Sequence, residues 1–439
     1  MNESMKKSGI EWIGEIPESW SINKIKYLAI LKGRIGWQGL TSEEYQDDGA
    51  YLITGTDFLN GTINWESCVR IPESRWEEAK DIQIENGDLL ITKDGTVGKV
   101  AIVEQIPGKT SLNSGVLRIS TYPEYDRKFL FWVLQSSVFW GWFNYRNAGN
   151  STIIHLYQKD FGEFKYAYPS FRMQQEIAKH LDIKCLEISN VISTLERQIE
   201  LLLEYKKSLV TETVTKGLNP DALMKDSGIE WIGEIPEHWE VKKIKHIAAY
   251  IGSGTTPDTG TTEYYDGAIN WIQSGDLYKT SKVTNTEKTV TDLALNVFGT
   301  LKVYKQPFIV LAMYGASVGN VAISQIDACV NQACCVIIPN GYQYIDFLYY
   351  WLVTCKQDFD TKAIGGGQPN ISQQIIKNQY YLDAPREEQQ AIASFLNQRC
   401  AEIDSIINDK LKQIEVQKEY KQSLIYEYVT GKKRVKGVN

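Results

Sequence analysis

Residues 8–20 read SGIEWIGEIPESW and residues 227–239 read SGIEWIGEIPEHW, so thirteen residues recur 219 positions further on with one change. A match of this length within 439 residues indicates a duplication. The change is Ser19 against His238, and we expect it to matter little. A chain that presents one unit twice is typical of proteins that bind a repeated or two-fold symmetric partner.

A second pair of repeats follows at an offset of 215, where QQEIA at 174–178 matches QQAIA at 389–393. The match continues in EYKKSL at 204–209 against EYKQSL at 419–424. Between the repeats the likeness is faint, as in GTVG at 95–98 against ASVG at 316–319, and the offset drifts between 215 and 221. Each half is therefore expected to contain a diverged globular segment followed by a better preserved one.

Composition places the chain among soluble globular proteins, with 43% hydrophobic and 23% charged residues. It has no apolar run of the roughly 18 residues needed to span a membrane and no signal-peptide pattern at its start. We therefore expect a cytoplasmic protein of two or three domains. Seven cysteines and four scattered histidines lack metal-ligand spacing, which predicts free buried thiols and no metal site.

The net charge of −7 and the pI near 5.4 argue mildly against a nucleic-acid partner. An average does not exclude a basic groove on an acidic body. The one basic run, KKR at 432–434, is expected to be a solvated tail.

Apolar residues recur at alternating steps of three and four in two long segments, the first of which (171–216) contains no Gly or Pro. This spacing predicts two helices with coiled-coil seams. The seam residues are Leu181, Cys185, Ile188, Ile192, Leu195, Ile199, Leu202 and Leu209 in the first helix, and Leu396, Cys400, Ile403, Ile407, Ile414 and Leu424 in the second. Gly217 and Gly431 are expected to end them.

A helix of about 45 residues is about 68 Å long at 1.5 Å per residue, more than a globular segment of this size would cover. We therefore expect the two helices to pack antiparallel and to hold two heads apart as a rod. The alternative is that each helix packs separately on its own domain.

The two diverged segments are expected to be mixed α/β. Apolar runs bounded by turns predict strands at 50–54, 88–92, 100–103, 115–120, 308–313, 321–324 and 333–338, and helices at 126–139 and 344–355. Polar or Gly-rich stretches at 148–156 and 364–372 suit close approach to a ligand, but ordinary surface turns have the same composition.

No catalytic constellation is visible. Gly108-Lys109-Thr110 has Val103 where a phosphate loop requires Gly, and neither GxSxG nor HExxH occurs. We therefore expect no enzymatic activity from this chain.

The order of these parts resembles the specificity (S) subunit of type I restriction–modification systems. The matching features are the EWIGEIPExW opening of each half, the PxxxQQxIA helix start at 385–393, and two long helical repeats alternating with two variable segments. The first helix start, 169–178, carries one residue more and lacks the acidic residue found at Glu388, which could alter a partner contact.

The resemblance implies a mixed α/β fold with two target-recognition domains separated by two long helices packed as an antiparallel coiled coil, with an internal pseudo-two-fold repeat. The implied segments are a first recognition domain at 1–168, a first spacer helix at 169–217, a second recognition domain at 218–384, a second spacer helix at 385–431 and a basic tail at 432–439. The two recognition domains are called head 1 and head 2 below.

The resemblance also implies function. Each head would read one half of a bipartite, asymmetric target in double-stranded DNA, and the chain itself would be non-catalytic and bind no cofactor. It would recruit two modification (methyltransferase) subunits, which bind S-adenosylmethionine and methylate adenine, and through them restriction subunits that use ATP and Mg²⁺. The competing hypotheses are a two-headed coiled-coil protein adaptor without DNA binding, and heads that are themselves an enzyme.

Candidate DNA-binding residues are polar or basic side chains in the diverged loops, because such side chains suit base edges. They are Gln38, Lys93, Thr96, Lys99, Asn150, Ser151 and Thr152 in head 1, and Thr255, Thr256, Tyr314, Ser317, Asn320, Gln368 and Asn370 in head 2.

Overall fold

A computed structural model describes residues 4–34, 40–148, 155–278, 280–365, 367 and 369–435. The chain forms two compact units. Unit 1 consists of Met1–Glu196 and Leu411–Asn439, and unit 2 of Arg197–Lys410. Each unit therefore contains one head and a part of each long helix.

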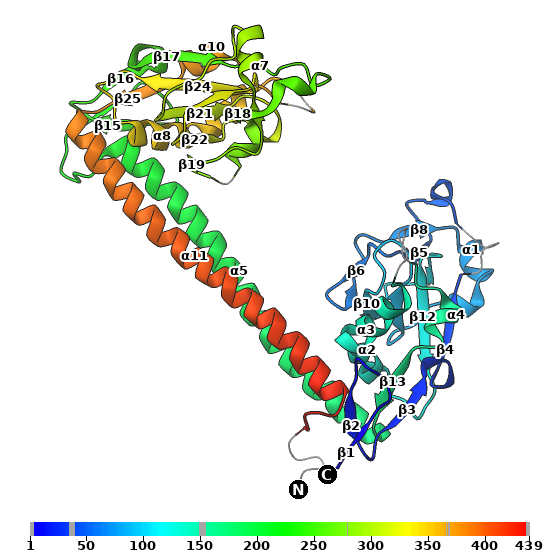
Figure 1. The fold of residues 1–439 in the computed structure, drawn as a ribbon. Coiled ribbons are helices and arrows are strands. Elements are labelled where there is room, and N and C mark those ends of the chain that lie inside the picture. Colours follow the sequence, from blue (N-terminus) through cyan, green and yellow to red (C-terminus); the bar gives the residue numbers. More distant parts are fainter. Residues whose placement is uncertain are drawn as a thin grey trace. The chain divides into compact units, whose positions relative to one another are not determined.

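The two long helices are α5 (Phe171–Lys216) and α11 (Arg386–Val429), drawn side by side in Figure 1. In unit 1, the start of α5 packs against the end of α11, with Leu181 and Cys185 in one buried cluster with Leu424 and Ile425. In unit 2, the end of α5 packs against the start of α11, with Val214 in one cluster with Leu396. The helices are therefore antiparallel, as predicted.

All fourteen predicted seam residues are buried or half-buried. Lys206 takes a seam position in α5, and its ammonium group lies 2.6 Å from an oxygen of Asp404 on α11. Lys421 donates to Ser189 Oγ at 2.8 Å in unit 1, and Lys410 donates to Gln198 Oε1 at 2.7 Å in unit 2. The helices end at Gly217 (φ 76°) and Gly431 (φ 73°), the left-handed conformation that favours glycine.

Head 1 combines a four-stranded sheet of order β10-β9-β12-β4 with a three-stranded sheet of order β11-β5-β8. Its strands are β1 (Met5–Lys7), β2 (Glu15–Pro17), β3 (Ser21–Lys24), β4 (Ala29–Gly33), β5 (Ala50–Ile53), β6 (Phe58–Leu59), β7 (Thr62–Ile63), β8 (Val69–Ile71), β9 (Leu89–Thr92), β10 (Val100–Ile102), β11 (Thr110–Leu112), β12 (Val116–Thr121) and β13 (Lys165–Tyr168). Its helices are α1 (Glu73–Glu77), α2 (Arg127–Gln135), α3 (Ser137–Arg146) and α4 (Gln158–Phe161).

Head 2 repeats this plan with a five-stranded sheet of order β17-β24-β21-β22-β19 and a three-stranded sheet of order β20-β18-β23. Its strands are β14 (Met224–Asp226), β15 (Glu234–Pro236), β16 (Glu240–Lys243), β17 (Ala248–Ser253), β18 (Tyr265–Ile272), β19 (Lys282–Val283), β20 (Thr289–Val290), β21 (Phe308–Ala312), β22 (Val321–Ser324), β23 (Ala328–Val330), β24 (Cys334–Pro339) and β25 (Tyr380–Asp383). Its helices are α6 (Ile244–Ile247), α7 (Asp292–Val297), α8 (Ile345–Thr354), α9 (Lys356–Lys362) and α10 (Gln373–Asn378).

The predicted strands are confirmed, but the single helix expected at 126–139 is wrong. It is two helices, α2 and α3, separated at Ser136, whose backbone is extended (ψ 167°). The Ser136 hydroxyl accepts a bond from Val138 N–H at 3.2 Å and so caps the second helix. A local cap thus interrupts an apolar run that the spacing alone treats as continuous.

The opening motif folds alike in both halves, as a β1–β2 hairpin and a β14–β15 hairpin, each followed by a buried tryptophan. The change of Ser19 to His238 comes with a contact that the sequence did not indicate, and the expectation that the change matters little stays a prediction. His238 Nε2 lies 2.7 Å from Glu388 Oε1, and Trp239 Nε1 donates to Glu388 Oε2 at 3.0 Å. The register of β13 with β3, and of β25 with β16, makes Met173 the counterpart of Glu388. Ser19 and Met173 therefore replace His238 and Glu388 together, and Glu388 contacts its own chain.

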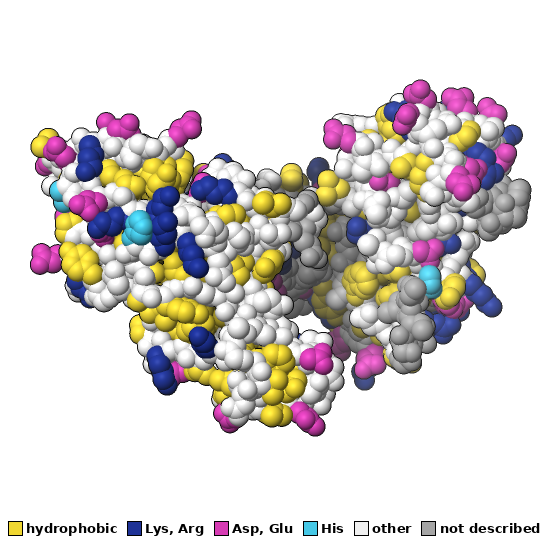
Figure 2. All heavy atoms as spheres, turned by 90° about the horizontal axis from the view of Figure 1, so that it is seen from above, with side chains coloured by type: hydrophobic (Ala, Val, Ile, Leu, Met, Phe, Trp, Pro, Cys, Tyr) yellow, Lys and Arg dark blue, Asp and Glu magenta, His cyan; other side chains and the backbone are white. Residues whose placement is uncertain are grey.

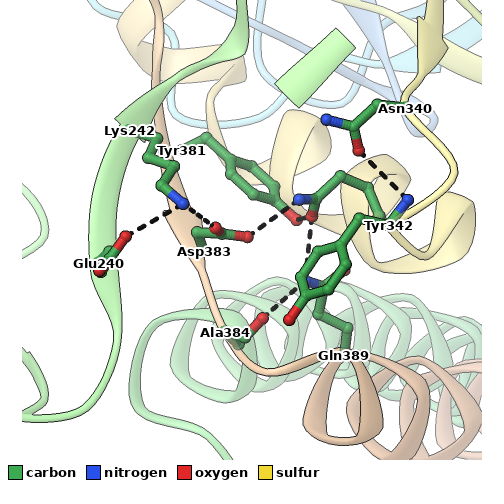
Figure 3. Close-up of polar contacts among 9 residues, drawn as sticks. Glu240, Lys242, Asn340, Tyr342, Tyr381, Asp383, Ala384 and Gln389 are labelled. Atoms are coloured by element: carbon green, nitrogen blue, oxygen red, sulfur yellow. Dashed lines mark hydrogen bonds and ion pairs between the residues drawn. The ribbon is translucent and has the colours of Figure 1, made fainter. Parts of the chain in front are cut away.

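The first glutamine of each QQ pair bonds the start of a long helix to its head, and Figure 3 shows this for Gln389 in unit 2. Gln389 donates to Ala384 O at 2.7 Å and to Gln343 Oε1 at 3.0 Å, and accepts from Tyr344 N–H at 2.9 Å. In unit 1, Gln174 makes the matching bonds with Pro169 O (2.9 Å) and Asp126 N–H (2.8 Å). Each glutamine side chain donates to the carbonyl of the residue five positions before it, so the first helix start has no inserted residue relative to the second. Its proline is displaced by one position.

Candidate nucleic-acid interface

In head 1, a hairpin turn between β9 and β10 presents three of the candidate residues. Buried Thr92 accepts a bond from Lys99 N–H at 2.9 Å through its hydroxyl, which also donates to Thr96 O. Gly95 (φ 69°) and Gly98 (φ 84°) take left-handed conformations in the turn. The GTVG sequence therefore fixes a short loop whose Lys93, Thr96 and Lys99 lie together.

The end of the polar stretch at 148–156 joins this hairpin in head 1. Leu156 N–H donates to Lys93 O at 2.9 Å. His155 Nδ1 lies 2.6 Å from Asp94 Oδ1, with the two side chains 38% and 41% exposed. Residues 61 positions apart in the sequence thus form one surface, and neither Asp94 nor His155 was a sequence candidate.

Head 2 builds the same junction from the hairpin between β21 and β22. Gly315 N–H donates to Pro369 O, and Ile371 N–H donates to Met313 O, both at 2.9 Å. Tyr314 is 46% exposed at the tip. The structure therefore brings the candidates Tyr314, Ser317, Asn320 and Asn370 to one place.

The loop after β5, and its counterpart after β18, completes each surface. Thr54 N–H donates to Asp57 Oδ2, and Gln273 N–H donates to Asp276 Oδ2, both at 2.7 Å. In head 1, the Thr96 hydroxyl donates to Gly55 O at 3.2 Å, so this loop touches the hairpin. The sequence signal for these loops is ITGTD at 53–57 against IQSGD at 272–276, which share only Ile and Asp at matching positions.

The ends of β4 and β17 differ between the heads. Arg34 follows β4 and is buried, donating to Leu112 O at 2.8 Å and to Ser111 Oγ at 2.9 Å. Burial lowers the pKa of Arg34 below its ordinary value. In head 2, Thr255 and Thr256 follow β17, and the Thr256 hydroxyl donates to Gln332 Oε1. The candidates Gln38, Asn150, Ser151, Thr152 and Gln368 lie outside the described residues.

Exposed charge also differs between the heads. Lys24 and Lys26 of head 1 each lie 2.5 Å from Glu163, whose pKa their hydrogen bonds hold at about 2. Strand register makes Asn378 the counterpart of Glu163 in head 2. There Lys243, Lys245 and Lys377 have no ion pair with any described residue. Figure 2 shows several Lys and Arg side chains gathered around a histidine over head 2.

Other chemistry is limited within the described ranges. No three His, Cys, Asp or Glu side chains there are placed to hold a metal ion, and no helix there is long and apolar enough to cross a membrane. All seven cysteines are free. Burial raises the pKa of Cys185 to about 11 and that of Cys329 to about 12, so these thiols remain protonated at neutral pH.

Comparison with known proteins agrees with this architecture. The family model of the type I restriction modification DNA specificity domain matches twice, at residues 17–201 and 236–416, so the chain belongs to this family. Each match combines one head with much of the long helix that follows it.

Two relatives from Methanocaldococcus jannaschii are named as specificity subunits of the type I restriction enzymes MjaX and MjaVIII. They are 27% and 26% identical to the chain, cover 99% and 97% of it, and are covered over 97% and 95% of their own length. Among solved structures, a chain of a type I R-M system aligns with a TM-score of 0.73 at 14% identity, covering 95% of this chain and 99% of that one. The HsdS subunit from Thermoanaerobacter tengcongensis aligns with a TM-score of 0.52 at 13% identity, covering 95% and 98%. These structural likenesses concern the fold.

Proposed function

We propose that this DNA-specificity subunit reads a bipartite, asymmetric target, one half with each head. The observation that carries the proposal is the repeated junction of hairpin and loops described above. Its backbone frame is the same in both heads, whereas the exposed side chains differ, as in Asp94 and His155 against Tyr314 and Asn370. Recognition of two half-sites with different sequences requires different side chains, which a shared backbone arrangement can present in the same position.

The antiparallel helices are proposed to set the gap between the half-sites. Ser189 faces Lys421, Gln198 faces Lys410, and Lys206 faces Asp404 across the pair. Deleting residues 193–199 together with 410–416 removes facing heptads of about 10.5 Å. At 3.4 Å per base pair, the unspecified gap should shrink by about three base pairs while both words stay the same.

We further propose that the long helices bind two modification subunits. Apolar side chains other than those of the seam stay exposed on both helices, each between 46% and 61% accessible. They are Ile183, Leu186, Val191, Leu201, Leu203 and Tyr205 on α5, and Ile406, Leu411, Val416 and Tyr420 on α11. Exposed apolar residues in such number favour a protein partner. S-adenosylmethionine, ATP and Mg²⁺ are proposed to bind to the partner subunits, since the family match is to the DNA-specificity domain alone.

The direct test maps methylated adenines in the source genome with and without this gene. Loss of one bipartite, asymmetric motif supports the proposal. Unchanged methylation in cells that express the system contradicts it and favours the adaptor hypothesis.

A further inference from the structure

We propose that His155 reads a base edge in the half-site of head 1 and that Asp94 is its positioning residue. This inference rests on the proposed function, and it assigns the contact with the base to Nε2 of His155. His155 Nδ1 lies 2.6 Å from Asp94 Oδ1, so the carboxylate fixes one ring nitrogen. The pair sits where the β9–β10 hairpin meets residues 155 and 156, and both side chains remain more than a third exposed.

The backbone around the pair is held from both sides. Lys93 N–H donates to Gly115 O at 2.8 Å, and Lys93 O accepts from Leu156 N–H at 2.9 Å. A frame with these two bonds orients the side chains at 94 and 155 before any DNA arrives, which reduces the ordering cost of binding.

Head 2 supplies an internal comparison at the same positions. Leu156 and Ile371 make the same backbone bond, to Lys93 O and Met313 O. Tyr314 therefore corresponds to Asp94, and Asn370 to His155. The frame is retained and both exposed side chains are changed, which is the pattern expected of positions that distinguish the two words.

The chemistry of the pair determines what it can read. A carboxylate accepts a hydrogen bond, so it favours the ring form with a hydrogen on Nδ1. Nε2 of the neutral ring is then an acceptor. In the major groove the donors are the N6 amino group of adenine and the N4 amino group of cytosine. His155 should therefore select adenine or cytosine at one position.

A surface ion pair without a reading role is the competing explanation. Such pairs contribute little to stability, and removing one leaves base preference unchanged. The Arg146–Asp160 pair of head 1, 2.8 Å between Nη2 and Oδ1, is exposed to a similar extent and serves as the matched control.

The test maps adenine methylation in cells carrying the complete system with the wild-type chain, His155→Ala, Asp94→Ala, Asp160→Ala or Tyr314→Ala. In His155→Ala, discrimination at one base pair should fall roughly tenfold. Asp94→Ala should admit guanine or thymine at that same position, because the ring can then present Nε2–H. Asp160→Ala should leave the motif unchanged, and Tyr314→Ala should alter only the other half.

An unchanged motif in His155→Ala, or changes in the same half from His155→Ala and Tyr314→Ala, would overturn the inference. If His155→Ala abolishes all methylation, His155→Gln decides the matter. Gln offers an acceptor oxygen, so restored activity with adenine or cytosine kept supports the inference, and failure to restore contradicts it. Absence of any bipartite motif in wild-type cells would refute the proposed function instead.

Discussion

Replacing Gln389 by alanine should loosen the attachment of α11 to head 2. Gln389 is fully buried and makes three hydrogen bonds with Ala384, Gln343 and Tyr344. At about 1 kcal/mol for each buried bond, the local free energy of opening should fall by about 3 kcal/mol. The half-buried Tyr344 N–H and the buried Ala384 O lose this partner, which adds to the cost.

The assay is amide hydrogen exchange resolved by peptide over the first turns of each long helix. Where the exchange rate is set by the equilibrium between the closed and open states, a loss of about 3 kcal/mol speeds amide exchange there roughly 150-fold. Gln174→Ala removes two bonds in unit 1, so the start of α5 should lose about 2 kcal/mol.

The chain offers a matched control in the second glutamine of each QQ. Gln390 and Gln175 are exposed, so alanine at either should change exchange by less than about 0.5 kcal/mol. Equal effects of Gln389→Ala and Gln390→Ala would refute the assigned role of the buried glutamine.

Three further predictions concern differences between the units. Lysine–phosphate contacts release counterions, so DNA binding becomes more dependent on salt as their number rises. Asn378→Glu adds a carboxylate near the lysines of head 2 and should weaken DNA binding and lower its salt dependence, whereas Glu163→Asn in head 1 should do the opposite. Equal salt slopes in the two variants would contradict this. Burial lowers the pKa of His180 from its ordinary 6.5, so as the pH falls the unfolded chain binds the proton before the folded chain does. Unit 1 should therefore lose stability as the pH falls through 6.5. The thermal unfolding of His180→Phe should lack this part of the pH dependence. Tyr426→Thr removes hydroxyl bonds to the carbonyls of residues 12 and 13 and should destabilise unit 1 in urea by about 2 kcal/mol. At the counterpart in unit 2, Thr211→Tyr faces a groove of about 710 Å³ and should be tolerated.

Periodic and repeated features were predictable from the sequence. The seams of α5 and α11 follow from steps of three and four, since a helix places such residues on one stripe. The strands β9 and β21 follow from short apolar runs between turns, because strands buried on both faces need apolar residues at every position.

Contacts between distant residues were not predictable in this way. Asp94 meets His155, and His238 meets Glu388 150 positions away, and local spacing carries no information on such pairs. The division of α2 from α3 at Ser136 depends on a cap that competes with a continuous apolar run. The order β10-β9-β12-β4 likewise depends on tertiary packing.

The central claim is that each head reads its own word independently. It is tested most directly by a chain in which residues 224–383 are replaced by a second copy of residues 5–168, since these segments begin and end on equivalent strands. Methylation mapping should then show a target whose two halves are the same word, the one that head 1 reads in the natural chain. A motif that keeps the original second word, or that is asymmetric in any other way, would contradict the claim.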